Sequence, residues 1–370
     1  MSNSAGTGGL AKRAATSGFS WWGRELGTYA VIYMAILGLV AFTLFVSALQ
    51  GVDFVPFLER YAQSAVSGCV LVGSMLLIAV CVKALVYDRS GSPLRAVVAS
   101  LSAIVRSDML WRYLFACAWL ILMLAAFLYN KMMIPEVAPF SWDPTFARWD
   151  QVLFLGHSPW EVLHPMLGYP MITATLDLLY GLWGPMMFMF WAGAFASPRV
   201  PALLRARLWM SMILSWIVIG LVMATLLSSA GPCYFGDVVP GMTSPYAGLM
   251  QYLAEARSEP PLLAVIAQEY LWQGHIGNHD MPGGISAMPS MHNAQAVLFA
   301  AFAYRLDRRF GHAMTVFALL IFIGSIHLGW HYAVDGIVGA GAALAIWWIC
   351  GAFAPKMFPN AFSAARPVNP

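Results

Sequence analysis

Long apolar runs separated by short polar segments dominate the hydrophobic pattern of this chain. Most runs are near the ~20 residues that a helix needs to cross about 30 Å of hydrocarbon. They predict transmembrane helices over approximately 29–49, 64–86, 109–129, 171–195, 208–230, 289–304, 312–330 and 333–353. The run at 289–304 is shorter than the others, as expected for a helix whose first turn lines a site. We therefore predict an all-α fold, a polytopic membrane helical bundle of about eight transmembrane helices.

Composition agrees with this class of protein. The 370 residues are 60% hydrophobic and only 10% charged, and the mean hydropathy is +0.70, values that no soluble domain of this length needs. The net charge of +3 does not indicate a nucleic-acid partner, because the basic residues are sorted by membrane side. The five cysteines show no metal-ligand spacing and four of them fall in apolar runs, so we expect no metal, no other cofactor and no disulfide framework.

The distribution of basic residues predicts the orientation. If the N-terminus is cytoplasmic and all eight runs cross, the cytoplasmic segments and helix ends hold 16 of the 20 Lys and Arg residues. This is a strong positive-inside pattern. It predicts an integral protein of the cell (inner) membrane with both termini in the cytoplasm. The four basic residues left on the extracytoplasmic side are Arg60, Lys131, Arg148 and Arg257.

Several connecting segments are predicted to be helical themselves. Ser92-Pro93 begins an amphipathic stretch that is typical of a cytoplasmic helix on the membrane surface. Outside, Asp143-Pro144 and Ser158-Pro-Trp-Glu161 are typical helix starts, the second with a capping-box pattern. The outer loop over 231–288 is long enough to form a lid with short helices. Its ionisable residues near the end are His275, His279 and Asp280.

Two histidines open apolar runs that lie one helix pair apart. His292 begins one run, and His331 precedes another with Asp335 four residues later. The two turns should bring both histidines to the same water-facing rim, where ionisable groups are costly to keep and are therefore functional candidates. The alternatives are that the histidines are interfacial anchors and that Asp335 is a plain charge at a helix N-terminus.

The types of residue fit phosphoryl transfer, which needs a nucleophile, a proton donor and charge stabilisation. His331 can attack when neutral, with Asp335 holding its other ring nitrogen in the required tautomer. His292 lies in a first helical turn, where free N–H groups favour a phosphate. As a general acid it would contribute roughly 10²–10⁴-fold, and it would then serve as base in the second step.

Two motifs resemble those of a known family. Pro289-Ser290-Met291-His292 and Trp330-His331-Tyr-Ala-Val-Asp335-Gly336 resemble the second and third signature motifs of the type 2 phosphatidic-acid phosphatase superfamily. Three features differ from the usual pattern. Met291 replaces a glycine, Gly324-Ser325 stands where Ser-Arg is usual, and the first motif, Lys-x6-Arg-Pro, is absent.

These departures resemble the branch that contains inositol-phosphorylceramide and sphingomyelin synthases, as does Gly231-Pro232-x-Tyr234. The resemblance is specific over about 231–350. It implies a six-helix catalytic core at 109–353, and from it we predict a division of the whole chain. The other segments are a cytoplasmic tail at 1–28, two extra transmembrane helices with an interfacial helix at 29–108, and a cytoplasmic tail at 354–370.

The resemblance also implies a substrate site whose usual cations are missing. Arg148 and Lys131 are the best substitutes for them, with Arg257 behind, and His327 could assist if protonated. The alternative is that each of these is a solvated loop charge. The motif positions suggest three further substrate-binding residues, Ser290, Met291 and Tyr234.

Together these features predict a membrane enzyme that moves a phosphate-bearing lipid headgroup through a phosphohistidine. The acceptor is either water, as in a lipid-phosphate or prenyl-phosphate phosphatase, or a polar alcohol, as in a headgroup transferase. The missing cations favour the transferase. A rival from another class is a non-catalytic lipid transporter that keeps its histidines for proton coupling. It predicts inverted repeats, which are not evident in the sequence.

Overall fold

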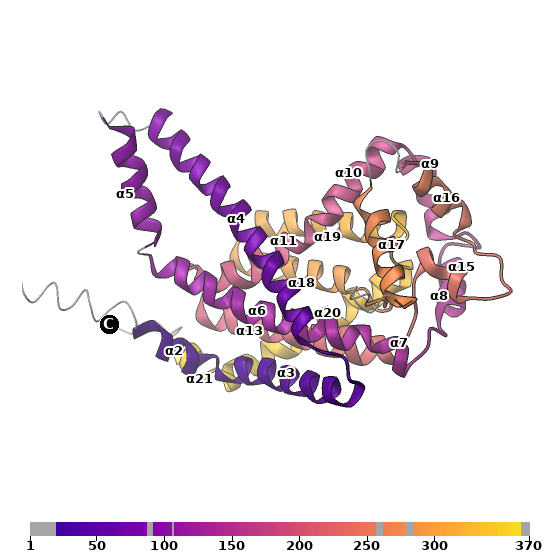
Figure 1. Cartoon of the computed structure of the whole chain (residues 1–370), viewed down its shortest axis with the longest axis horizontal. Helices are drawn as coiled ribbons and strands as arrows, with labels where there is room; N and C mark the ends of the chain where they lie inside the picture. The colour runs from indigo at the N-terminus through magenta and orange to yellow at the C-terminus, as the bar shows by residue number, and fades with distance from the viewer. Residues whose placement is uncertain (1–19, 87–91, 106, 257–261, 278–283, 364–370) are drawn as a thin grey trace, which may run out of the picture.

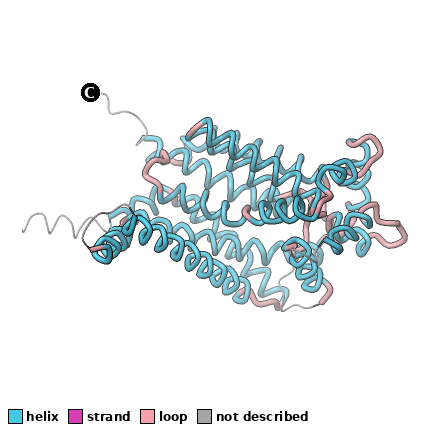
Figure 2. Tube along the Cα trace, turned by 90° about the horizontal axis from the view of Figure 1, so that it is seen from above, coloured by secondary structure: helices cyan, strands magenta, loops and turns pink. Residues whose placement is uncertain are grey.

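The structure, a computed structural model, describes residues 20–86, 92–105, 107–256, 262–277 and 284–363. Every regular element within these ranges is a helix, as Figures 1 and 2 show, so the predicted all-α membrane bundle is confirmed. Among the described residues, six helices are long and apolar enough to cross a membrane. They are α3 (Ala30–Gln50), α6 (Asp108–Met132) with α7 (Ile134–Val137), α10 (Pro170–Gly181) through α12 (Ala194–Ala196), α13 (Ala202–Leu214) through α14 (Ala224–Leu226), α19 (Arg308–His327) and α20 (Ala333–Met357).

The two other predicted spans have different forms. The run at 64–86 lies within a longer helix, α4 (Val55–Val86), and the run at 289–304 is α18 (Met291–Leu306), with only 16 residues. Two of the long helices contain π-helical stretches, at Met189–Gly193 and Ser215–Met223. Such stretches often mark functional sites.

The core of the bundle surrounds α18, which packs against α19 and α20. Apolar residues occur on all sides of this helix, the pattern expected for a helix buried within a bundle. Aromatic rings fill the space beside it: Phe190 stacks on Phe299 at 4.4 Å, and Trp191 stacks on Trp209 at 5.1 Å between ring centroids.

The two ends of the bundle differ. At one end α2 (Ser20–Thr28) lies beside α21 (Pro359–Ser363), so both predicted tails contain helix, and the rest of each tail lies largely outside the described residues. At the other end a cap of short helices covers the bundle (Figure 1). These are α7, α8 (Asp143–Leu153), α9 (Pro159–Leu167), α15 (Phe235–Val238), α16 (Ala247–Ala256) and α17 (Leu263–His275).

The predicted helix starts in the cap are present. Asp143-Pro144 begins α8, and the Glu161 carboxylate accepts a hydrogen bond of 2.8 Å from the Ser158 backbone N–H ahead of α9. The loop over 231–288 contains the expected short helices, and His275 ends α17. His279, Asp280 and Arg257 lie outside the described residues.

The helix expected after Ser92 is also present as α5 (Pro93–Val105). It folds back along α4, and together the two helices lean away from the rest of the bundle (Figure 1). Its position on a membrane surface stays a prediction.

Candidate active site

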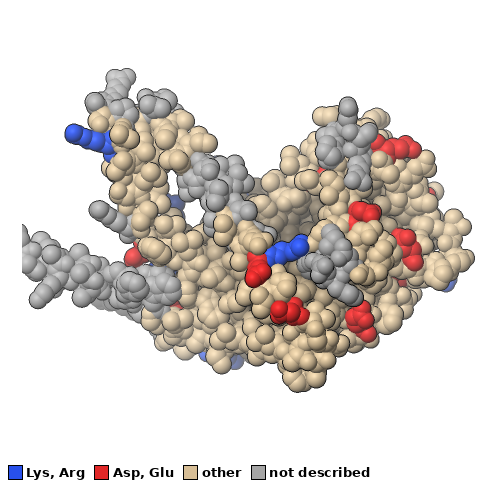
Figure 3. Space-filling model, viewed as in Figure 1, with Lys and Arg blue, Asp and Glu red and all other residues tan. Residues whose placement is uncertain are grey.

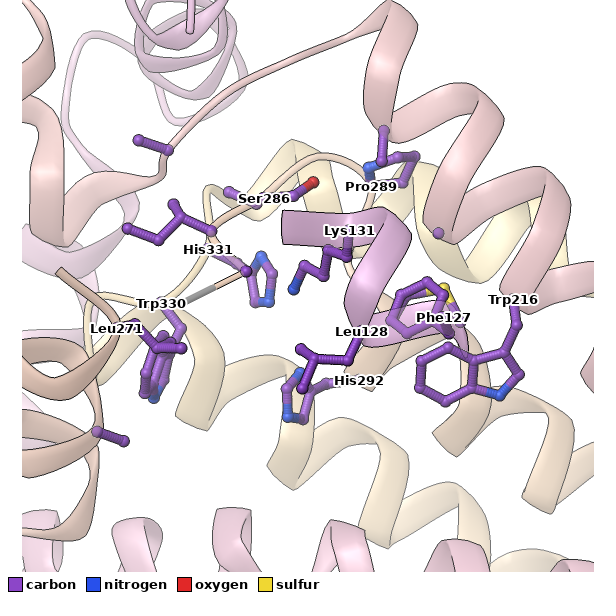
Figure 4. A pocket seen from close by; sticks show the side chains of 18 of the residues that line it. Phe127, Leu128, Lys131, Trp216, Leu271, Ser286, Pro289, His292, Trp330 and His331 are labelled. Atoms are coloured by element: carbon purple, nitrogen blue, oxygen red, sulfur yellow. The ribbon is translucent and has the colours of Figure 1, made fainter. Parts of the chain in front are cut away.

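A cavity of about 340 Å³ lies where the bundle meets its cap. Figure 4 shows His292, His331 and Lys131 inside it, on three different parts of the fold. The rest of the wall is mostly apolar and aromatic. It includes Tyr61, Phe127, Leu128, Tyr180, Trp183, Trp216, Gly220, Tyr234, Ala267, Leu271, Ser286, Met291 and Trp330.

His331 lies in the turn between α19 and α20, and its side chain is hydrogen-bonded to that of Asp335. Its Nδ1 is 3.3 Å from the Asp335 Oδ2, which also accepts a 3.1 Å hydrogen bond from the Tyr332 backbone N–H. Asp335 is fully buried. A carboxylate at this position favours the tautomer with the proton on Nδ1, so Nε2 keeps its lone pair.

Two glycines shape the turn that carries His331. Gly329 has a φ of +74° and Gly231 a φ of +104°, conformations that residues with a side chain rarely adopt. The Gly329 carbonyl accepts a 2.9 Å hydrogen bond from the Cys233 N–H, and a Cβ on Gly231 would lie 2.8 Å from the Trp330 carbonyl oxygen. The Gly-Pro-x-Tyr segment therefore supports the turn from behind.

A buried carboxylate on α8 binds the start of α20. The Asp150 oxygens accept hydrogen bonds from the backbone N–H groups of Ala333, at 2.7 Å, and Val334, at 2.9 Å. These are among the N–H groups that a helix leaves unpaired at its first turn, where a negative charge is also favourable. Burial raises the pKa of Asp150 to about 7, although these hydrogen bonds act in the opposite direction.

Asp143, on the same helix, binds the other side of the turn. Its carboxylate accepts hydrogen bonds from the N–H groups of Ala230 and Gly231 and one of 2.7 Å from the Tyr332 hydroxyl. The Asp143-Pro144 pattern predicted only a helix start, and no role was predicted for Asp150. Their spacing of seven residues, which places both on one face of a helix, was the available signal.

His292 lies in the first turn of α18 between two aromatic rings. Its imidazole stacks on Tyr180, with centroids 4.7 Å apart, and contacts Trp183 at 4.3 Å. The Trp183 indole N–H also donates to the His292 carbonyl, at 3.1 Å. The His292 and His331 centroids are 6.0 Å apart. Both rings can therefore contact the same substrate group in the cavity.

The two histidine segments are joined through their backbones. The Ser290 N–H donates to the Asp335 carbonyl at 3.1 Å, and a Cβ on Gly339 would meet the Ser290 carbonyl oxygen at 2.5 Å. The Asn293 amide donates to the Ser325 hydroxyl of α19 at 3.3 Å. The structure thus brings His292, His331 and Asp335 together, and their catalytic roles stay predictions.

Lys131, near the end of α6, lies between the two histidines in Figure 4. It is the one Lys or Arg among the described residues that line the cavity. Burial, followed by the charge of Lys131, lowers the pKa of His331 to about 3. His331 is therefore neutral near pH 7, as a nucleophile requires.

Two other predicted phosphate contacts lie elsewhere. Arg148 is exposed on α8, two residues from Asp150 and therefore about 200° around that helix, and it does not line the cavity. His327 is fully buried and its Nε2 is 2.9 Å from the Thr173 hydroxyl. Since it ends α19 facing α10, it also lies outside the cavity wall.

The remaining predicted substrate-binding residues are Met291, Tyr234 and Ser290, and only the first two line the cavity. Met291 and Tyr234 line the cavity, and the Tyr234 hydroxyl donates to the Gln268 carbonyl at 2.9 Å. Ser290 is buried as the N-cap of α18, with its hydroxyl accepting from the Asn293 N–H at 3.4 Å, and is not among the lining residues. Within the described parts of the chain, no cluster of three or more His, Cys, Asp or Glu residues could hold a metal ion.

Comparison with known proteins gives one family. The family model described as the PAP2 superfamily matches residues 144–349, more than half of the chain. The match includes both histidine segments, whereas α3, α4 and Lys131 precede it. The comparison with curated proteins finds no match, and neither does the comparison with solved structures.

Proposed function

The chain belongs to the PAP2 superfamily, and from this membership we propose that it transfers a phosphate-bearing lipid headgroup through a phosphohistidine on His331. Membership by itself supports a phosphatase-type reaction on a phosphate-bearing substrate. The main support for transfer through a phosphohistidine is the pair of imidazole rings of His292 and His331, whose centroids are 6.0 Å apart. The Asp335 carboxylate is hydrogen-bonded to the His331 ring.

In the first step, the His331 Nε2 attacks phosphorus and the bond from phosphorus to the leaving oxygen breaks. The protonated His292 ring gives one N–H proton to that oxygen and becomes neutral, so the products are a phosphohistidine and a neutral alcohol. The Asp335 carboxylate stabilises the charge that develops on the His331 ring.

In the second step, His292 removes the proton from an acceptor hydroxyl. The acceptor oxygen bonds to phosphorus as the bond to His331 breaks, which restores both histidines. Water as the acceptor gives a phosphatase, and a polar alcohol gives a transferase. The aromatic rings of Tyr180 and Trp183 hold the His292 ring for both proton transfers.

The charge of the cavity supports a phosphodiester substrate. A phosphate monoester carries about −1.5 to −2 at pH 7, because its second pKa is near 6. A diester lacks that second ionisation and carries a single charge. Lys131 and the protonated His292 that the first step requires supply two positive charges, and the Asp335 carboxylate beside the neutral His331 supplies one negative charge. The net charge of about +1 balances a diester more nearly than a monoester. This favours a headgroup transferase that resembles inositol-phosphorylceramide synthase.

Purified protein in lipid nanodiscs tests the proposal with two labelled donors. Phosphatidylinositol with a ceramide acceptor should give a labelled headgroup on the acceptor, together with an acid-labile, base-stable phosphoenzyme. His331→Gln should give neither product. Release of inorganic phosphate from phosphatidic acid alone would show instead that the enzyme is a phosphatase with water as acceptor. Failure of both donors would refute phosphoryl transfer.

We also propose that the cavity faces the extracytoplasmic side, with both termini in the cytoplasm. The support is the division of basic residues, 16 to 4. Leu155, 92% exposed between α8 and α9, and Arg309, at the opposite end of the bundle, are suitable sites for single cysteines in a Cys-free protein. An impermeant maleimide should label Leu155→Cys but not Arg309→Cys in intact cells. The opposite labelling would reverse the orientation.

A further inference from the structure

The catalytic cavity is too small for a whole membrane lipid. Its volume of about 340 Å³ is near the lower end of the roughly 300–1,000 Å³ of pockets that bind drug-sized ligands. That space accommodates a phosphate headgroup and a few carbon atoms. The hydrocarbon chains of any bilayer lipid that reacts there must therefore leave the cavity through an opening in its wall.

Such an opening lies between α4 and the helices α10 and α17. Figure 3 shows the surface hollowed between these helices, on the face drawn in Figure 1. The cavity wall on this side is formed by Tyr61 of α4, Tyr180 of α10, and Ala267 and Leu271 of α17. Aromatic and aliphatic side chains here, beside the His292 ring, fit hydrocarbon rather than water.

The position of α4 beside the cavity is fixed by packing on α6. The rings of Phe54 and Phe57 pack on Tyr129 with centroids 6.1 and 5.1 Å apart. The Tyr129 hydroxyl donates to the Val52 carbonyl at 3.0 Å. Tyr61 lies one turn beyond Phe57, on the same face of the helix, and therefore reaches the cavity.

A second contact joins α4 to the cap. The Arg60 guanidinium donates to the Tyr270 hydroxyl of α17 and lies over the same ring, 5.4 Å from its centroid. Arg60 and Tyr61 are neighbours, so one turn of α4 both holds the cap and lines the cavity. This contact limits how far α4 and α17 can separate beside the opening.

We propose that this turn of α4, which lies outside the family match, forms the binding site for the hydrocarbon chains of the lipid substrate. Tyr61 contacts the chains, and Arg60 sets the width of the opening through Tyr270. The inference rests on the proposed function, because it assigns chains to the lipid that reacts with His331. Since lipid tails are as apolar as the wall, the chains are selected by contact and shape rather than by transfer from water.

The kinetic test compares a long-chain donor with a soluble short-chain analogue that has the same headgroup. Tyr61→Ala should lower the ratio of kcat/KM, long chain over short chain, by about tenfold, a typical loss for apolar contacts in a pocket. Arg60→Gln should lower it less. Val66→Ala, at a 63% exposed position of α4, and Glu59→Gln are the controls and should preserve the ratio. An unchanged ratio in Tyr61→Ala, or an equal loss for both substrates, would overturn the inference.

Photocrosslinking gives a test that does not depend on turnover. A phosphodiester lipid with a diazirine in its chain should label the α4 peptide that contains Tyr61 more strongly than a diacylglycerol with the same chain. The exposed residues Met34 and Phe45 of α3 report contact with bulk lipid and should be labelled equally by both. Equal labelling of α4 by the two lipids would refute the chain site. Specific α4 labelling without phosphoryl transfer would refute the proposed reaction alone.

Discussion

His327 and His331 are four residues apart, and their surroundings are opposite in character. His331 lines a cavity, has Asp335 on one ring nitrogen and lies opposite another imidazole. His327 is sealed between α19, α10 and α16, where its Nε2 contacts Thr173 and its ring lies 6.1 Å from that of Tyr252. Its Nδ1 has no hydrogen-bond partner among the described residues.

The turn between the two histidines explains the difference. On a continuous helix, residues four apart lie on one face and would meet the same neighbours. Here α19 ends at His327 and the chain reverses at Gly329, so that the two rings point to different sides of the bundle. The comparison shows that the backbone conformation of a five-residue turn decides which histidine can meet a substrate.

The largest expected effect separates the nucleophile from the acid. His331→Gln should reduce turnover of the natural lipid by at least about 10⁴-fold and abolish the burst of nitrophenol from a nitrophenyl phosphodiester. His292→Gln should also lose the natural reaction but keep a single burst, because nitrophenolate leaves without a proton. Stopped-flow absorbance measures both. A burst that survives in His331→Gln and disappears in His292→Gln would show that His292 is the nucleophile and His331 the acid.

The next effect concerns the partner of His331. Asp335→Asn should slow turnover by about 10²–10⁴-fold, because the amide does not favour the tautomer with the proton on Nδ1. Folding should survive, since a neutral amide is cheaper than a carboxylate within a membrane bundle. Rates and lipid binding are measured together in nanodiscs. Normal turnover would mean that Asp335 has a structural role alone.

The pH dependence of kcat/KM tests whether the charge of Lys131 acts on His331. Protonation of His331 removes the nucleophile, so kcat/KM should fall as the pH drops through its pKa, which is lowered to about 3, well below the usual 6.5. Lys131→Met removes a neighbouring positive charge. It should therefore raise this pKa and move the acid limb to higher pH, and it should raise KM for the phosphate-bearing donor. Lys131→Arg is the control that keeps the charge. If the acid limb of Lys131→Met lay at the same pH as in the wild-type enzyme, the charge of Lys131 would have no effect on His331.

The smallest expected effect is at His327. His327→Gln keeps a group that can bond the Thr173 hydroxyl, and the loss in stability should be about 1 kcal/mol or less, a typical value for one hydrogen bond. Turnover should stay within about threefold of the wild-type rate, because the ring lies outside the cavity wall. Thermal unfolding and steady-state rates test this together. A loss as large as that of Asp335→Asn would mean that His327 takes part in the reaction.

Local sequence patterns were sufficient to predict the class of fold and to bring His292, His331 and Asp335 forward as candidates for the site. Apolar runs of sufficient length must become helices in a membrane, because only internal hydrogen bonds can satisfy their backbone groups. The positions of His292, His331 and Asp335 at the starts of such runs placed all three near one end of the bundle. Short-range rules also located α8 and α9, since helix starts depend on neighbouring residues alone.

The side chains that surround these three residues could not be predicted in the same way, because they come from distant helices. Lys131 and Arg148 were equal candidates as outer cations. Only the packing of α6 against the π-helical stretches Met189–Gly193 and Ser215–Met223 brings Lys131 to the cavity that holds the histidines. Asp150 lies 183 residues from the Ala333 N–H that it binds. Such contacts depend on how distant helices meet, and local pattern carries no information about that.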